Sequence, residues 1–205
     1  MYIVASPFKT ATTTVGHALV DLGAGKRCMG YDAAVMSSAK PIIRRLNTLV
    51  TPDQNFTHFK RQHGAAVRRA MLPLLPKLAH FDIFADAPLG HTHFHPFVRK
   101  IVAPKARFIW VNRDTKEWLR SARRWETAHP DVYRNHTVWA DDAKSRRRVL
   151  RQKWRANWAE FTQLRDAFPD DCLVIDMADL NNYAALASFT GRRVIPGPMP
   201  RHNVG

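Results

Sequence analysis

The sequence has no long run of apolar residues and only two cysteines. A membrane-spanning helix needs roughly 20 consecutive apolar residues, so we expect no membrane span. The apolar run at the N-terminus is too short for a secretory signal. Two cysteines exclude a disulfide scaffold, and without an export signal both are expected to be reduced. These absences predict a cytoplasmic protein.

Acidic residues are scarce, and neither internal repeats nor low-complexity tracts are present. Lys and Arg number 32 against 17 Asp and Glu, which gives a net charge of +15. Such a surplus favours anionic partners: nucleotide, nucleic acid, sulfated sugar or acidic lipid. Hydrophobic residues make up 45% of the chain, which excludes a disordered protein. The length and the absence of a linker predict one domain over residues 1–205.

Predicted strands and helices alternate along the chain. The strands are expected at residues 2–5, 27–31, 81–85, 107–111 and 172–175. The helices are expected at 12–22, 33–49 with an interruption at Pro41, 65–78, 115–127, 141–168 and 183–190. This order predicts an α/β fold: a single three-layer domain with a mostly parallel sheet of about five strands and helices on both faces. Ligands of such sheets bind beyond the carboxyl ends of the strands.

The loop after the first strand has the composition of an anion site. Backbone amides and the dipole at a helix N-terminus attract anions, and a lysine adds a full positive charge. The sequence GxxxxGK[ST] of ATP- and GTP-hydrolysing P-loops is absent, which disfavours that chemistry. The alternative is that the threonines only cap the helix. The candidate binding residues are Lys9, Thr10, Ala11, Thr12, Thr13 and Thr14.

A second candidate phosphate site follows the strand at 107–111. Arg113 leaves the carboxyl end of this strand, and Ser121 lies eight residues later. A guanidinium and a hydroxyl suit a phosphate monoester. The alternative is a surface Arg113 paired with Asp114, beside a solvated serine.

Together these segments resemble the sulfotransferases that use 3′-phosphoadenosine 5′-phosphosulfate (PAPS). Residues 7–13 (PFKTATT) resemble the family's 5′-phosphosulfate loop, with Ala11 where glycine is usual. Residues 107–125 resemble its 3′-phosphate segment. Asp86-Ala87-Pro88 and residues 200–204 (PRHNV) are similar to a bacterial branch of the family.

The resemblance implies a P-loop-like fold, PAPS as the donor and adenosine 3′,5′-bisphosphate (PAP) as the product. It implies that Lys9 stabilises charge on the leaving nucleotide, so that no metal is required. Arg113 and Ser121 would hold the 3′-phosphate. Arg192 and Arg193 are further candidates for contacts with the 3′-phosphate or adenine.

An acceptor hydroxyl also needs a base. The resemblance points to the end of the third strand, where Asp86 is the first candidate and His91 the second. A structural role of Asp86, as a helix cap or an arginine partner, is the alternative. His91, His93 and His95 would face one side of an extended strand and form a possible zinc set, but Pro96 ends the segment and a basic loop near the acceptor is favoured.

Two other functions fit parts of the sequence. A basic segment with no acid could make the chain a polyanion- or nucleic-acid-binding protein without catalysis, although its tryptophans suit a solvated helix with a buried face. The other alternative is a nucleotide or small-molecule kinase. The absence of the GxxxxGK[ST] sequence argues against it. We expect a small-molecule or carbohydrate acceptor rather than nucleic acid, in a pocket shaped by the loops after Gly30 and at 51–64. The oligomeric state cannot be read. The basic residues of the segment are Lys144, Arg146, Arg147, Arg148, Arg151, Lys153 and Arg155.

Overall fold

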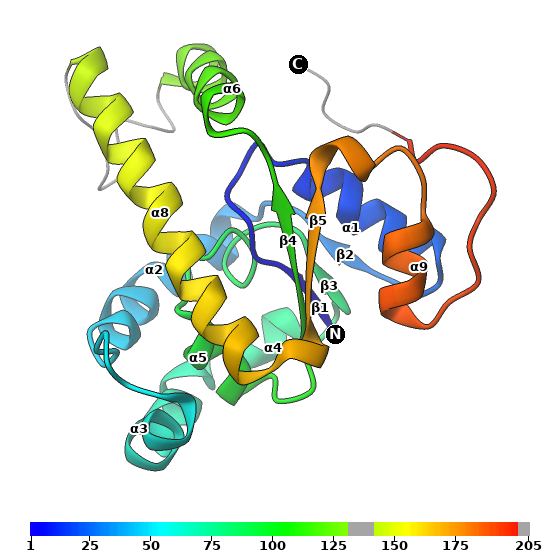
Figure 1. Cartoon of the computed structure of the whole chain (residues 1–205). Coiled ribbons are helices and arrows are strands. Elements are labelled where there is room, and N and C mark those ends of the chain that lie inside the picture. The colour runs from blue at the N-terminus through cyan, green and yellow to red at the C-terminus, as the bar shows by residue number, and fades with distance from the viewer. Residues whose placement is uncertain (131–141, 201–205) are drawn as a thin grey trace.

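The computed structural model contains one five-stranded parallel sheet. It describes residues 1–130 and 142–200. The strand order is β2-β3-β1-β4-β5, and every neighbouring pair is parallel. All carboxyl ends therefore lie at one edge of the sheet (Figure 1). The strands are β1 (Tyr2–Val4), β2 (Cys28–Met29), β3 (Ile83–Phe84), β4 (Arg107–Asn112) and β5 (Cys172–Asp176).

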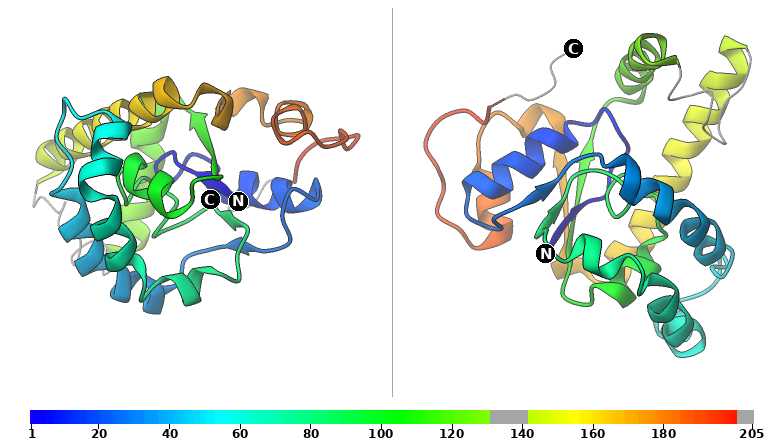
Figure 2. Two further views of the ribbon diagram at one scale, coloured as in Figure 1. Left: turned by 90° about the horizontal axis from the view of Figure 1, so that it is seen from below. Right: turned by 180° about the vertical axis from the view of Figure 1, so that it is seen from behind.

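Helices cover both faces of the sheet (Figures 1 and 2). The helices are α1 (Thr12–Asp21), α2 (Ala33–Asn47), α3 (Phe56–Met71), α4 (Leu75–Leu78), α5 (Pro96–Val102), α6 (Thr115–Ala128), α8 (Ala143–Ala167) and α9 (Ala184–Thr190). Two short 3-10 turns, η1 (Pro169–Asp171) and η2 (Met177–Asp179), flank β5.

Strand β4, which lies between β1 and β5, shows how the three layers are formed. Phe108 and Trp110 point into a core that contains residues of α2, α3, α5 and α8. Ile109 and Val111 point into the opposite core, which contains residues of α1 and α9. All four side chains are fully buried, as expected for a strand between two helical layers. The predicted α/β fold with helices on both faces is confirmed.

The sequence placed most elements correctly and missed parts of two. Pro41 lies inside α2 and does not interrupt it. A proline in a helix costs roughly 3 kcal/mol, but α2 is held by buried Val35, Met36 and Leu46. The helix predicted at 65–78 is two helices, α3 and α4, separated after Met71. Helix α3 begins earlier than predicted, at Phe56, because the Asn55 side chain accepts a hydrogen bond from the His58 amide.

Helix α5 was not predicted. It begins directly after the His91–His95 segment, because the His95 ring caps it and Pro96 suits the first turn of a helix. The predicted starting residue of α8, Asp141, and residues 201–204 of the resemblance lie outside the described residues.

Both cysteines lie in strands, as predicted. Cys28 belongs to β2 and Cys172 to β5, at opposite edges of the sheet, and both are free thiols. Burial raises the pKa of Cys28 and raises the pKa of Cys172 to about 12. No helix of the described residues is long and apolar enough to cross a membrane.

Candidate functional site

The loop between β1 and α1 lies at the carboxyl edge of the sheet and has an unusual backbone. Lys9 and Ala11 both take a positive φ, 62° and 59°. Ala11 is the N-cap residue of α1 and holds a left-handed conformation. This conformation explains why glycine is usual at that position, since L side chains disfavour it.

The Thr10 side chain shapes the loop from inside. Thr10 is fully buried, and its hydroxyl lies 2.6 Å from the Pro7 carbonyl and 2.9 Å from Ser6 Oγ. These contacts close the loop across four residues. Only the backbone of Thr10 is therefore in a position to meet a ligand.

The amino-terminal turn of α1 faces the same loop. The first bond of the helical pattern runs from the Val15 amide to the Ala11 carbonyl, so the amides of Thr12, Thr13 and Thr14 point out of the helix at its positive end. Such amides are suited to anions.

Arg113 reaches this loop from the end of β4. Its Nη1 donates to the Lys9 carbonyl at 2.7 Å, across 104 residues of sequence. The alternative interpretation, a pairing of Arg113 with Asp114, is not what the structure shows, because Asp114 caps α6 through the amides of Lys116 and Glu117. The two candidate anion sites predicted from sequence are thus joined into one.

A second contact fixes α6 to the loop. Trp118 Nε1 donates to the Phe8 carbonyl at 2.8 Å, and the two rings pack edge to face. Trp118 was not singled out from the sequence, because its partner lies 110 residues away. Ser121 lies one helical turn after Trp118 and is also buried. We infer from this helical spacing that Ser121 shares the face of α6 that packs on the loop.

The cations of this cluster repel one another. The pKa of Lys9 is lowered by partial burial and then by the charges of Arg113 and Arg124. Burial also lowers the pKa of Arg113, with further contributions from Arg124 and Arg120 that Glu117 opposes. Arg113 Nε is buried and has no hydrogen-bond partner among residues 1–130 and 142–200. A cluster with excess positive charge and an unpartnered buried donor fits a phosphorylated ligand.

Asp86 and His91 lie beside the start of α1. His91 Nε2 is 3.0 Å from the Thr12 hydroxyl, and His91 Nδ1 is 3.4 Å from Asp86 Oδ1. Asp86 also accepts a hydrogen bond from the Ala87 amide at 2.7 Å. Gly90 permits this arrangement, since a Cβ there would come within 2.6 Å of the Asp86 carbonyl oxygen. Asp86 therefore orients the His91 ring, and Nε2 faces α1.

The His91 ring is kept neutral by its surroundings. Its side chain is 12% exposed, and burial lowers its pKa. Asp86 opposes this shift, while the positive charge of Lys153 adds to it. A neutral imidazole whose Nδ1 faces a carboxylate carries its lone pair on Nε2. This nitrogen can accept a proton.

The three histidines do not share one face of a strand. His91 and His93 stack with ring centroids 6.3 Å apart, but His95 caps α5, its Nδ1 accepting from the Phe97 amide. His91 has φ 54°, which is not an extended conformation. Within residues 1–130 and 142–200, no three metal-ligating side chains form a group that could hold a metal ion.

Arg192 and Arg193 follow the end of α9, which does not lie beside the loop between β1 and α1. The Phe189 ring packs on Tyr2, with centroids 6.4 Å apart, and its carbonyl accepts a hydrogen bond from Arg107. Tyr2 and Arg107 are the first residues of their strands, so α9 ends at the amino-terminal edge of the sheet (Figure 1). The role of Arg192 and Arg193 in binding the nucleotide stays a prediction, and their position after α9 does not support it.

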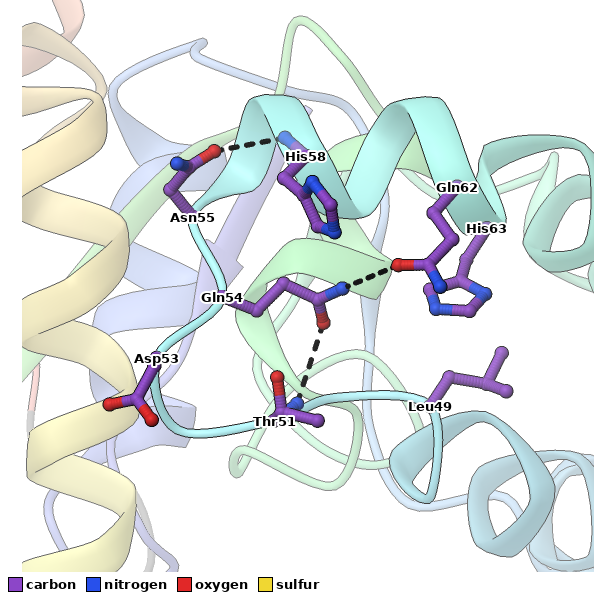
Figure 3. Close-up of a pocket in the computed structure, with 8 residues that line it drawn as sticks. All are labelled: Leu49, Thr51, Asp53, Gln54, Asn55, His58, Gln62 and His63. Atoms are coloured by element: carbon purple, nitrogen blue, oxygen red, sulfur yellow. Dashed lines mark hydrogen bonds between the residues drawn. The ribbon is translucent and has the colours of Figure 1, made fainter.

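A polar pocket of about 410 Å³ lies between the end of α2 and the first turns of α3 (Figure 3). It falls within the segment predicted to shape the acceptor pocket, although residues 56–64 are helical and not a loop. Two of its amide side chains bond to each other: Gln54 Nε2 donates to Gln62 Oε1. The pocket is lined by Leu49, Thr51, Asp53, Gln54, Asn55, His58, Gln62 and His63.

One comparison with known proteins found a match to a family. A family model described as a sulfotransferase domain matches residues 2–205. No curated protein matches the chain. The match covers essentially the whole chain, including the loop at Lys9, the Asp86–His91 segment and the β4–α6 segment, and the chain belongs to the sulfotransferase family.

Proposed function

We propose that the protein transfers a sulfuryl group from PAPS to a hydroxyl or amine of a small-molecule or carbohydrate acceptor. The observation that carries the proposal is the contact between Arg113 and the Lys9 carbonyl. It joins the predicted 5′ and 3′ phosphate sites at the positive end of α1. The unpartnered Arg113 Nε supports an anionic ligand there.

Different residues of the site would bind the two ends of the nucleotide. Lys9 and the amides of the first turn of α1 would hold the 5′ group, while Arg113 and Ser121 would hold the 3′-phosphate. PAPS supplies the activated sulfuryl group when it is bound. Lys9 places a positive charge where negative charge develops on the departing oxygen, which is electrostatic stabilisation by a preorganised group.

His91 is the better candidate for the base. Asp86 was the first candidate from sequence, but its carboxylate faces His91 Nδ1 and the Ala87 amide. We assign His91 Nε2 as the proton acceptor and Asp86 as the residue that orients the ring. In the structure the Thr12 hydroxyl lies 3.0 Å from His91 Nε2. The hydroxyl of the acceptor would replace this contact or share it.

The first experiment is calorimetric titration with PAP at two salt concentrations, with adenosine 5′-monophosphate as the control ligand. We expect PAP to bind more tightly than the monophosphate at both salt concentrations. Ser121→Ala should reduce this preference, because it removes only a contact with the 3′-phosphate. Lys9→Met should abolish sulfuryl transfer.

Two results would replace the proposal. Weak binding that vanishes at higher salt, without preference for PAP and without an effect of Arg113→Ala, would favour the polyanion-binding alternative. Turnover of ATP instead of PAPS would favour the kinase. Full transfer activity in Lys9→Met would show that the role given to Lys9 is wrong.

A further inference from the structure

Lys153 on α8 lies against the loop between β1 and α1. Its Nζ is 5.7 Å from the centroid of the Phe8 ring. Phe8 precedes Lys9, and the same ring packs on Trp118 and Trp125 with centroids 6.0 and 5.7 Å away. Lys153 therefore lies close to the phosphate loop, although about 140 residues separate them in sequence.

Lys153 has no acidic counter-ion among residues 1–130 and 142–200. No carboxylate oxygen of these residues lies within 4.0 Å of its Nζ, the distance limit for an ion pair. Helix α8 contains no acidic residue before Glu160. The side chain is only partly exposed, and burial lowers its pKa. A partly buried cation without a counter-ion is unfavourable until an anion meets it.

Lys153 and Lys9 have different charged neighbours. The charges of Arg113 and Arg124 lower the pKa of Lys9, whereas the charge of Lys153 lowers the pKa of His91. The amino-terminal half of α8 extends past the carboxyl ends of the strands, beside α6 (Figures 1 and 2). The contact of Lys153 Nζ with the Phe8 ring places this second positive charge beside the loop.

We propose that Lys153 binds an oxyanion at the point of transfer, beside the Phe8 ring of the β1–α1 loop. The oxyanion is carried either by the donor, as its sulfuryl oxygens, or by the acceptor, as a carboxylate, sulfate or phosphate next to the reacting group. This inference rests on the proposed function. It singles out one lysine of the basic segment as a specificity-determining residue.

The test uses Lys153→Met, which keeps the unbranched stem against Phe8 and removes the charge. Lys144→Met is the matched control, because Lys144 is an exposed lysine of the same helix. Lys153→Arg restores the charge and serves as the second variant if the Met variant unfolds. Calorimetry would measure PAPS and PAP binding, and then methyl glucuronide and methyl glucoside binding to the PAP-loaded protein.

Either of two results supports the proposal. If Lys153→Met weakens PAPS binding about tenfold or more while PAP binding is unchanged, the oxyanion belongs to the sulfuryl group. If the variant instead loses a preference for the glucuronide over the glucoside, the oxyanion belongs to the acceptor. In both cases Lys144→Met should behave as the unaltered protein, and Lys153→Arg should recover most of the affinity.

Three results overturn the proposal. One is unchanged binding of all four ligands in Lys153→Met. Another is an equal loss of PAP and PAPS affinity, which would mean that Lys153 only supports the loop. The third is an equal effect of Lys144→Met, which would reflect general charge. If the unaltered protein binds neither PAP nor PAPS, the proposed function fails. Lys153 is then tested separately with inorganic sulfate, whose binding should be lost in Lys153→Met and kept in Lys144→Met.

Discussion

Ala11 occupies a backbone position that suits glycine. Its φ of 59° and ψ of 27° lie in the left-handed region, directly before α1. An alanine there carries steric strain that glycine avoids. The strain lies inside the β1–α1 loop, between Lys9 and the first amides of the helix, so this one residue affects the stability of the loop.

We predict that Ala11→Gly stabilises the protein by about 1 kcal/mol, the size expected when a left-handed residue loses its Cβ. Urea unfolding would measure the change. Ala65→Gly, at an exposed position inside α3, is the control and should destabilise by about 0.5–1 kcal/mol. An Ala11→Gly protein as unstable as the control would show that residue 11 is not strained.

Helix α5 depends on a histidine that must stay neutral. His95 Nδ1 accepts the amide of Phe97 at 3.2 Å, which requires a lone pair on that nitrogen. Burial first, and the charge of Arg99 second, lower the pKa of His95 to about 4. Arg99, on the same helix, donates to the Leu89 carbonyl at 3.2 Å. The cap of α5 is therefore coupled to the segment that carries Asp86 and His91.

This coupling predicts a loss of stability in mild acid. Below pH 6.5 the unfolded chain protonates His95 while the folded chain resists until about pH 4, so the free energy of unfolding falls as the pH falls through this window. The loss attributable to His95 is about 2 kcal/mol between pH 7 and pH 5. Urea unfolding at both pH values would measure it.

His95→Asn is the matched variant, because asparagine caps helices well and does not titrate. It should remain stable at pH 7 and lose clearly less stability at pH 5 than the unaltered protein. His91, whose pKa is also lowered, remains in both proteins and cancels in the comparison. An equal acid loss in the two proteins would assign it to other groups.

At the scale of the whole molecule, a net charge of +15 opposes folding. Like charges are closer in the folded state than in the unfolded chain, and salt screens their repulsion. We expect the Tm to rise by a few degrees between low and moderate sodium chloride, equivalent to about 1 kcal/mol for a chain of this length. A Tm that falls with salt would mean that attractive ion pairs dominate.

Sodium sulfate at the same ionic strength separates screening from binding. It should raise the Tm further than chloride, because sulfate can occupy the anion site at Lys9 and Arg113 and stabilise the folded state by mass action. Lys9→Met should lose this additional increase but keep the screening effect. An equal sulfate effect in both proteins would show that the anion binds elsewhere.

Sequence by itself determined the order of elements and the position of the loop that carries Lys9. Both depend on neighbours: periodic apolar residues define the strands and helices, and Lys9 with its threonines occupies one turn between β1 and α1. Local rules failed where packing or a cap prevailed. Core contacts keep α2 continuous through Pro41, and side-chain caps extend α3 to Phe56 and create α5.

Only the tertiary structure decided which residues meet. Arg113 and the Lys9 carbonyl, Trp118 and the Phe8 carbonyl, and Lys153 and the Phe8 ring are each more than 100 residues apart along the chain. Asp86 and His91 are near in sequence, but the tight turn at Gly90 decided that the carboxylate faces the ring. The physical reason is that a sequence pattern reports local conformation, whereas the charge and desolvation of a site depend on packing between distant segments.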